Sequence, residues 1–453
     1  MTDTILVVGG GLAGLTAALH CANAGARVTV VERDAVVGGK LSAAMTQKSS
    51  AGDFIDGVPL PKLAVVAENS SIELLTMAEV TAVEGTPGNF DVSLREQARF
   101  VTDACTRCNN CKPVCPQVLP NEYEAGLSYR KAIFTPHVEA LPEAFAIDID
   151  ACLNTPPNYL PCNRCIEACD DDAIFFDVPL EQIHERKVGA IVIAAGDEIA
   201  PISESGAFGY GENPDVVTAD ELECLLTAPG PTGGFAARPS DEAYPSSLLL
   251  VLDELSPKAI YTAASQLSRL IEQSIDTIVL LVTVKPGDDE KAALLGQLPS
   301  GIDVRFGLLQ NVDGGEQGLA ATWVDFVSNE VPEAYFDMVV IGSDTRPPTG
   351  IDSLAADLGV ELAGSGYIDV DETGATSRPG IYAAGGVTGP AIIGETYERA
   401  SSAAAAALTH LDPRVLGIDV ASVAAVPGAA GVTEEELRGR IERALFSILD
   451  SGD

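Results

Sequence analysis

Eight of the ten cysteines fall in two short groups, and their spacing constrains this chain more than any other feature. The groups read Cys105-x2-Cys108-x2-Cys111-x3-Cys115-Pro116 and Cys152-x9-Cys162-x2-Cys165-x3-Cys169. The first is the bacterial ferredoxin run, whose fourth cysteine ligates the other cluster in two-cluster proteins. Because thiolates at such short spacings can converge on one soft metal centre, we predict that both groups bind metal.

The ferredoxin rule assigns these cysteines to two 4Fe–4S clusters. One cluster is predicted to be held by Cys105, Cys108, Cys111 and Cys169, and the other by Cys115, Cys152, Cys162 and Cys165. Zinc is the alternative, because paired Cys-x2-Cys steps also build zinc ribbons. A further Cys-x2 step followed by Cys-x3-Cys-Pro is rare in zinc sites and favours clusters. The spacing therefore predicts a chain that moves electrons.

Length and composition limit the number of structural units, the fold class and the location that we expect. At 453 residues the chain exceeds one ordinary core and should divide into several units. A hydrophobic content of 46% with only 5% aromatic residues fits an α/β protein. No apolar run approaches the ~18 residues of a membrane span, and the N-terminus does not resemble a signal peptide. Clustered cysteines without an export signal indicate a reducing cytoplasm, so we expect a cytoplasmic protein.

The formal net charge of −39 restricts the partners. Nucleic acid and anionic lipid surfaces would be repelled by such a chain. The charge is compatible with simple solubility in a host with an acidic proteome, or with a basic partner such as a small electron carrier. The charge alone does not decide between them.

The N-terminal segment has the pattern of a dinucleotide-binding turn. An apolar strand over 4–8 is followed by G-x-G-x-x-G at Gly9, Gly11 and Gly14, then a helix to about residue 24. Such glycines allow the tight turn, the close approach of a pyrophosphate and helix–strand packing. A second strand ends at Glu32, where an acidic side chain can bind ribose hydroxyls. Free amides at the start of the helix would face the phosphates.

Later segments resemble the flavin domain of two-dinucleotide-binding flavoproteins and favour FAD over NAD. Gly38–Leu41 is similar to the glycine pair that follows the acidic residue in that class, and 188–196 and 378–386 look like its later strands. The class usually has Asp where Gly386 stands. The residues predicted to bind FAD are Gly9, Gly11, Leu12, Ala13, Gly14, Glu32, Arg33, Gly39, Lys40, Leu41, Ala195, Gly196, Gly385 and Gly386.

Both cysteine groups lie between the Glu32 region and the strand at 188–196, so the ferredoxin-like module is predicted to be an insertion inside the flavin domain. The predicted fold is therefore α/β, a thioredoxin-reductase-like flavoprotein with an inserted two-cluster module. The expected boundaries are 1–95, 187–240 and 346–412 for the FAD domain, 96–186 for the module and 241–345 for a second Rossmann-like domain. Residues 413–453 are predicted to form a linker and an amphipathic helix.

The second Rossmann-like domain is predicted to have lost its NAD(P)H site. Its first strand, 248–252, is followed by Asp253-Glu-Leu-Ser-Pro-Lys-Ala-Ile260, which contains no glycine. Without glycines the backbone cannot approach a pyrophosphate, and Asp253 and Glu254 would repel one. Electrons are therefore expected to arrive from a protein or through a cluster.

Taken together, these motifs resemble the A subunit of heterodisulfide reductase and its relatives, which include the A subunit of the quinone-interacting membrane-bound oxidoreductase. The similarity spans about residues 4–410. Besides the first cysteine run, it is most specific at 83–90, 120–123, 130–134, 147–148, 229–234, 238–240 and 400–408.

The resemblance implies an FAD and iron–sulfur subunit of a larger complex that relays electrons between partner clusters and its flavin. Other electron-transfer subunits, and a second copy of the chain, are the partners it suggests. Because extra ferredoxin motifs and further cysteines of the methanogen pattern are absent from this sequence, linear or confurcating transfer is expected at least as much as bifurcation. The alternative is a stand-alone NAD(P)H-dependent flavin and iron–sulfur reductase resembling the small subunit of glutamate synthase.

Overall fold

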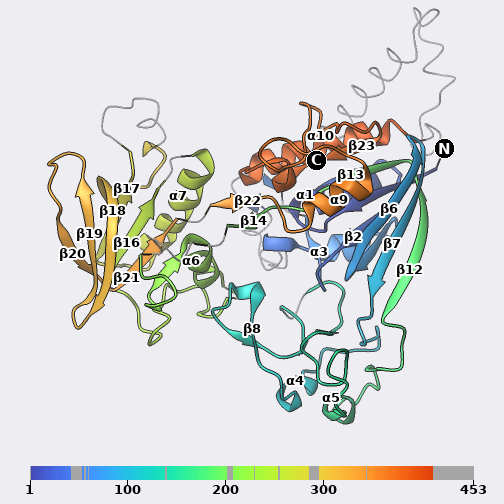
Figure 1. Ribbon diagram of the computed structural model, residues 1–453, viewed down its shortest axis with the longest axis horizontal. Coiled ribbons are helices and arrows are strands. Elements are labelled where there is room, and N and C mark those ends of the chain that lie inside the picture. Colours follow the sequence, from blue (N-terminus) through green and yellow to red (C-terminus); the bar gives the residue numbers. More distant parts are fainter. Residues whose placement is uncertain are drawn as a thin grey trace, which may run out of the picture. The chain divides into compact units, whose positions relative to one another are not determined.

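The computed structural model describes residues 2–41, 54–55, 58–59, 61–137, 140–200, 202, 208–228, 230–253, 256–284, 295–342 and 344–411. The predicted linker and C-terminal helix at 413–453 lie outside these residues. The chain divides into two compact units (Figure 1). Among the described residues, the first contains those within 2–119, 131–198 and 347–411, and the second contains those within 120–130 and 199–346.

The first unit is built on a five-stranded parallel sheet. Alternate residues of its central strand face opposite sides: Ile5 and Val7 join one apolar cluster, and Leu6 and Val8 join another. A strand buried on both faces reads as a continuous apolar run, which is why TILVV could be recognised from sequence. In spatial order the strands are β23 (Ile381–Ala383), β13 (Ala190–Ile193), β1 (Thr4–Val8), β2 (Arg27–Glu32) and β5 (Ile72–Thr76).

Two helices cover one face of this sheet, and a small antiparallel sheet with a further helix covers the other. On the first face α1 (Leu12–Asn23) and α10 (Ile393–Leu408) pack through alanines, which let the two helices approach closely. On the second face, apolar side chains of the antiparallel sheet and of α9 join those of β1 and β13. The elements of that face are β6 (Ala78–Thr86), β7 (Asn89–Gln97), β12 (Glu181–Val188) and α9 (Ile351–Leu358).

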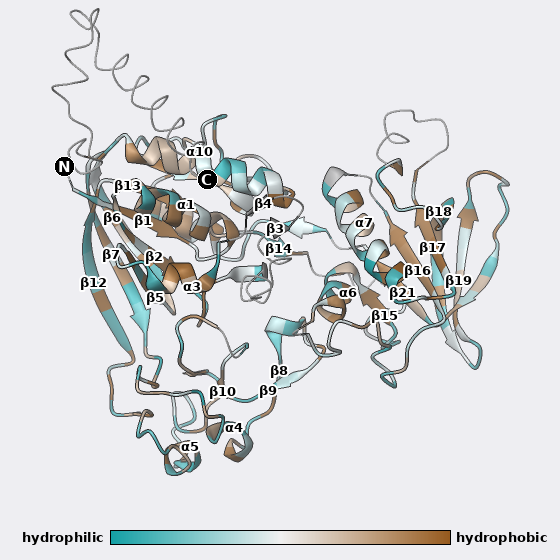
Figure 2. Cartoon of the chain, turned by 180° about the vertical axis from the view of Figure 1, so that it is seen from behind, coloured by the Kyte–Doolittle hydropathy of each residue, from teal (hydrophilic) through white to brown (hydrophobic). Residues whose placement is uncertain are grey.

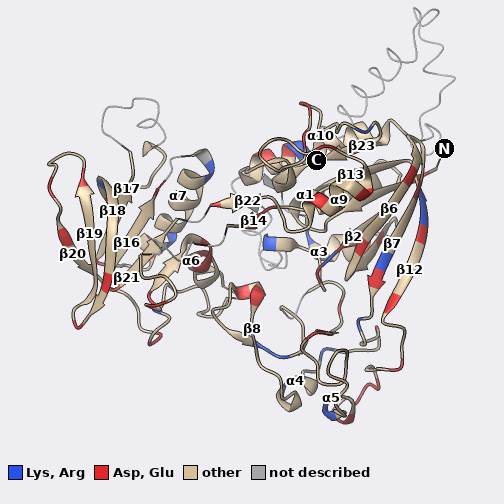
Figure 3. Ribbon diagram, in the orientation of Figure 1, with Lys and Arg blue, Asp and Glu red and all other residues tan. Residues whose placement is uncertain are grey.

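The outer strand of the antiparallel sheet is mostly hydrophilic, as Figure 2 shows for β12. Its basic residues pair with acidic residues of neighbouring strands: Arg186 with Glu73 at 2.8 Å and Lys187 with Asp91 at 2.5 Å. Figure 3 shows how few and scattered the Lys and Arg residues are compared with Asp and Glu, in line with totals of 27 and 66. Charged pairs on an edge strand also discourage pairing with another chain.

The cysteine-bearing segment 96–186 contains little regular structure before β12. Its apolar residues, among them Phe100, Ile133 and Phe145, form a separate small core together with Cys111, Cys152 and Cys165. Its elements are α4 (Cys111–Val114), α5 (Arg164–Glu167), β10 (Ile133–Phe134) and β11 (Ala146–Ile147). The remaining short elements of the first unit are η1 (Gly39–Leu41), β3 (Phe54–Ile55), β4 (Val58–Pro59), α3 (Leu63–Glu68) and η4 (Gly385–Thr388).

The second unit contains a seven-stranded sheet with a parallel part and an antiparallel part. The helices α6 (Ala219–Leu226) and α7 (Pro257–Glu272) pack on it through Leu222, Ile260 and Leu267. In spatial order the strands are β15 (Val216–Thr218), β21 (Met338–Ile341), β16 (Ser247–Leu252), β17 (Thr277–Val282), β18 (Asp303–Gly315), β19 (Gly318–Asp325) and β20 (Glu333–Phe336). The pairs from β15 to β18 are parallel, and β18, β19 and β20 are antiparallel.

Two segments group differently from the boundaries expected from sequence. Residues 199–240 belong to the second unit, because β15 pairs with β21 and α6 packs in the same core. Residues 120–130 interrupt the cysteine-bearing segment and also belong to the second unit, because Leu127 packs against that core. The remaining short elements are β8 (Leu119–Pro120), η3 (Glu122–Glu124) and β9 (Tyr129–Arg130), together with β14 (Glu198–Ile199), which pairs with β22 (Thr345–Arg346).

Candidate functional site

The turn between β1 and α1 has space only for glycine at two positions. Gly9 has a φ of +107°, and a Cβ there would overlap the carbonyl oxygen of Ala194, just after β13. A Cβ on Gly14 would overlap the carbonyl oxygen of Gly9. The turn is therefore packed tightly against both its own helix and the neighbouring strand end, as the dinucleotide-binding pattern requires.

The N-terminus of α1 is open. Gly11 is the N-cap residue and provides no side-chain cap, and the first turn, which begins with Leu12 and Ala13, contains no acidic residue. Within the described part of the chain, only Gly39, at 4.0 Å, would approach a Cβ on Gly11. The first amides of a helix need hydrogen-bond acceptors, and an uncapped helix start next to open space offers them to an anionic group. This geometry fits a pyrophosphate.

Glu32, at the end of β2, is bonded to the backbone of the turn. Its carboxylate accepts hydrogen bonds from the amides of Gly10 at 2.6 Å and Asp34 at 2.8 Å. Burial, together with the nearby carboxylate of Asp34, raises the pKa of Glu32 to about 7. Arg33, also predicted to contact the cofactor, is exposed, and it instead donates to the carbonyl of Thr349 at 3.1 Å and lies 3.7 Å from Glu198.

The remaining predicted FAD residues gather at the carboxyl ends of β13, β2 and β23. Ala195 and Gly196 follow β13, Gly39 to Leu41 form η1 after β2, and Gly385 and Gly386 begin η4 after β23. Lys40 forms an ion pair of 2.9 Å with Asp197. Sequence reasoning missed Asp197, although it directly follows the Ala-Ala-Gly run at 194–196. Ligands of open parallel sheets bind at this edge.

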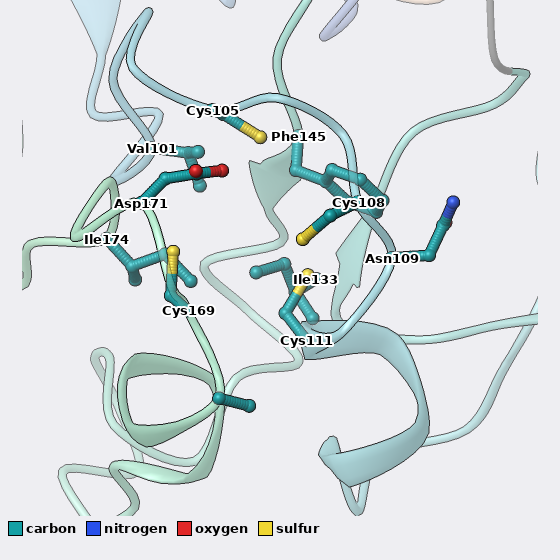
Figure 4. Close-up of a pocket in the computed structure, with 11 residues that line it drawn as sticks. Val101, Cys105, Cys108, Asn109, Cys111, Ile133, Phe145, Cys169, Asp171 and Ile174 are labelled. Carbon is teal, nitrogen blue, oxygen red and sulfur yellow. The ribbon is translucent and has the colours of Figure 1, made fainter.

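Four cysteines from both groups line one cavity, which Figure 4 shows with the sulfur atoms directed into the same space. Cys105, Cys108 and Cys111 come from the first group, and Cys169 comes from the second, 58 residues after Cys111. The cavity has about 290 Å³ of empty space, part of it open to solvent. The rest of the lining combines apolar residues with two polar ones, and consists of Val101, Ile133, Phe145, Ala168, Ile174, Asn109 and Asp171.

The other four predicted ligands are close enough to influence one another's ionisation. Burial, together with the neighbouring Cys152, Cys162 and Cys115, raises the pKa of Cys165 to about 11. Burial likewise raises the pKa of Cys152, with added contributions from Cys115 and Cys162. The structure thus brings each predicted set of four together in space.

The backbone around the first set also suits an anionic group. Arg107 and Asn109, on either side of Cys108, have positive φ values of 57° and 67°. Successive amides in such conformations make concave anion-binding surfaces that recur at iron–sulfur sites. The amide of Ala173 already donates to the sulfur of Cys169 at 3.4 Å. No three His, Cys, Asp or Glu side chains in the described ranges are arranged to ligate a single metal ion.

The corresponding edge of the second sheet is different. β16 is followed by Asp253, which accepts a hydrogen bond of 3.4 Å from Thr283 after β17. α7 begins with Pro257, and its N-cap Ser256 accepts from the amide of Ala259 at 3.1 Å. A carboxylate and a capped helix start therefore occupy the place where a nucleotide phosphate would need free amides.

Two family models match parts of the chain. Residues 4–60 match the model described as FAD dependent oxidoreductase, and residues 297–407 match that described as pyridine nucleotide-disulphide oxidoreductase. Thioredoxin reductase of Lactococcus lactis aligns over 92% of this chain and 99% of its own, with 15% identity and a TM-score of 0.47. The matched models and the two nucleotide-type sheets define a FAD-dependent oxidoreductase of the α/β class. This α/β flavoprotein fold was predicted from sequence and is confirmed, whereas the inserted two-cluster module stays a prediction.

Relatives of known name show which proteins the chain resembles. The iron–sulfur A subunit of the heterodisulfide reductase of Methanocaldococcus jannaschii is 31% identical over 423 residues, covering 88% of this chain and 63% of the relative. The second such A subunit of Methanopyrus kandleri is 32% identical over 437 residues, covering 91% of this chain and 65% of the relative. The chain thus spans somewhat less than two thirds of these relatives. Over most of its own length it is similar to heterodisulfide reductase A subunits, which is the resemblance that its motifs predicted.

Proposed function

We propose that this chain is the FAD and iron–sulfur electron-transfer subunit of a heterodisulfide-reductase-like complex, relaying electrons between partner clusters and its flavin without its own NAD(P)H site. The observation that carries the proposal is the convergence of eight cysteines from two separate runs in the same compact unit as the open glycine turn. FAD and 4Fe–4S clusters, when bound, supply the electron-transfer chemistry that these side chains lack.

The cysteine environment supports clusters. Two sets of four sulfurs are the soft donors that iron–sulfur clusters or zinc accept. Burial raises the pKa of Cys111 to about 12, so its thiolate needs a metal cation to stabilise it. Two features speak for clusters over zinc: the spacing of the first run and the positive-φ residues that flank Cys108.

The cysteine-bearing segment is attached directly to the loop that leads from Glu32 to η1. Both terminal nitrogens of Arg99 donate to the carbonyl of Ala35 at 2.7 Å. The amide of Val37 donates to the carbonyl of Leu141 at 2.9 Å. Leu141 also packs with Leu15 and Val37 in a small core. These contacts hold the cysteine-bearing segment against the proposed flavin site, which favours electron transfer between them.

The second sheet supports the absence of an NAD(P)H site. The segment 253–260 after β16 contains no glycine, Asp253 places a carboxylate there, and Ser256 already caps the amide of Ala259, all of which disfavour a pyrophosphate. Electrons are then supplied by partner proteins, and we propose other iron–sulfur subunits for that role and a second copy as a further contact. The relative from Methanothermobacter marburgensis is named as the A subunit of a heterodisulfide, ferredoxin reductase.

Among the described helices, none has the length and apolar character needed to cross a bilayer. We propose a cytoplasmic location.

The test is metal and flavin analysis of the chain purified without oxygen. We expect about eight iron and eight labile sulfide atoms, and FAD. Cys169→Ser should lose about half the iron, whereas Cys21→Ser should retain it all, because Cys21 is fully buried between α1 and α10. Dithionite should bleach the flavin and NADH should not. Zinc in place of iron would refute the cluster assignment, and rapid bleaching by NADH would favour the stand-alone reductase.

A further inference from the structure

We propose that Asp197 is a positioning residue of the flavin site, because its carboxylate holds the ammonium group of Lys40 across the end of β1. This inference rests on the proposed FAD site and deepens it. Lys40 would then present its ammonium to an anionic oxygen of the cofactor, either on the pyrophosphate or on the flavin ring.

The strand order places this pair over the glycine turn. β13 and β2 lie on either side of β1 and run parallel to it. Asp197 follows β13 and Lys40 follows β2, so both residues project from the carboxyl edge of the sheet. Strands two apart in a sheet are separated by about 10 Å. The 2.9 Å ion pair therefore bridges the carboxyl end of β1, where Gly9 begins the turn to α1.

The position of the Asp197 carboxylate depends on a glycine that follows the next strand of the sheet. A Cβ on Gly386, after β23, would lie 2.8 Å from Asp197 Oδ1 and 2.9 Å from its Cγ. A side chain at residue 386 would therefore displace the carboxylate. Asp197's side chain is 12% exposed, whereas that of Lys40 is 52% exposed. The carboxylate is thus the fixed member of the pair, and the ammonium group faces the open side.

The charges also fit this role. A carboxylate near the end of β1 would oppose an anionic cofactor unless a cation compensates it. An ammonium group has three donors, so Lys40 can bond Asp197 and still donate to a cofactor oxygen. Without Asp197 the long lysine side chain would lose its restraint, and its charge would no longer be balanced.

The test compares Asp197→Asn, Lys40→Met and the double variant in the full chain. Asp3→Asn is the matched control, because Asp3 pairs with Arg27 at 2.6 Å at the amino edge of the same sheet. The measurements are FAD affinity after removal and re-addition of FAD, and the flavin midpoint potential. Each single variant should weaken FAD binding about tenfold or more, as expected for loss of a charged hydrogen bond. The control should bind FAD like wild type.

Two further readouts separate positioning from a merely structural effect. The double variant should bind FAD no more weakly than the weaker-binding single variant, because the two residues act as one unit. If Lys40 faces the ring, Asp197→Asn should raise the midpoint potential and Lys40→Met should lower it. If Lys40 faces the pyrophosphate, affinity should change and potential should stay constant.

The proposal is overturned if Asp197→Asn matches Asp3→Asn in both measurements, or if the losses of the two single variants multiply in the double variant. Either result leaves the proposed function intact as long as the wild-type chain binds FAD. A wild-type chain that cannot be loaded with FAD refutes the proposed function itself. The two failures are therefore distinguishable.

Discussion

The two parallel sheets of this chain share a strand order but differ at the ends of their first two strands. The order β13-β1-β2-β5 in the first sheet corresponds to β21-β16-β17-β18 in the second. After β1 stands Gly9, whereas after β16 stands Asp253. β2 ends in Glu32, whereas β17 is followed by Thr283. The helix after the first turn is uncapped, and that after the second is capped by Ser256.

This difference shows that the residues that determine the fold are not the residues that determine ligand binding. Both sheets form because continuous apolar runs are buried on both faces. Binding of a dinucleotide depends on a few residues just beyond the strand ends, where the backbone must come close to phosphates. A sheet can therefore keep its architecture after those few residues have changed.

The largest expected effect comes from filling the first turn. Gly14→Ala places a Cβ on the carbonyl oxygen of Gly9. We expect loss of FAD and a fall in the free energy of unfolding of about 3 kcal/mol or more, because two backbone segments must separate. Flavin absorbance and denaturant unfolding measure both. Alanine is the better helix former, so propensity alone would predict the opposite sign.

Gly364→Ala is the control for this variant, since nothing lies within 4 Å of its Cβ position. Its free energy of unfolding should stay within about 0.5 kcal/mol of wild type. A Gly14→Ala protein that keeps its flavin and stability would show that the tight turn is not what distinguishes the two sheets.

The sequence was sufficient to predict the strands and the glycine turn. β1, β16, β17 and β21 are uninterrupted apolar runs, and such runs need no knowledge of distant residues. The membership of Cys169 in the first set of cysteines followed from the ferredoxin rule, and the structure places that residue in the same cavity as the other three. Its role as a metal ligand stays a prediction.

Contacts between residues far apart in the chain could not be predicted from the sequence. Lys40, Asp197 and Gly386 meet only because their three strands share an edge. Likewise, nothing local in 120–130 indicates that Leu127 packs in the core of the second unit. Such contacts depend on side-chain packing of the finished fold, which periodicity and spacing do not encode.

The two sheets should also differ in how pH changes stability. Glu32 can titrate at the end of β2, whereas Thr283, at the equivalent position after β17, cannot. Burial raises the pKa of Glu32 from 4.5 to about 7. The folded state therefore holds this proton more tightly than the unfolded state. The contribution of protonated Glu32 to the free energy of unfolding is fully present below pH 4.5 and is lost as the pH rises through about 7.

Glu32→Gln removes this titration and keeps a hydrogen-bond acceptor for Gly10. In FAD-free protein, wild type should lose stability relative to the variant between about pH 4.5 and 7, by on the order of 3 kcal/mol. Asp3→Asn should show a constant difference over this range, because Arg27 holds the pKa of Asp3 below 3.8. Denaturant unfolding at several pH values measures both. A pH-independent difference for Glu32→Gln would contradict the buried carboxylate.

The smallest expected effect concerns the helix caps. Ser256→Ala removes the acceptor for the amide of Ala259 at the start of α7, so the free energy of unfolding should fall by about 1 kcal/mol. Ser268→Ala, at an exposed position of the same helix, should change it by less than about 0.5 kcal/mol. The opened helix start should still not bind NADH, measured by equilibrium titration, because the carboxylate of Asp253 remains beside it and would repel the pyrophosphate. Measurable NADH binding by Ser256→Ala would show that the cap alone separates the second sheet from the first, and that the missing glycines matter less than the closed helix end.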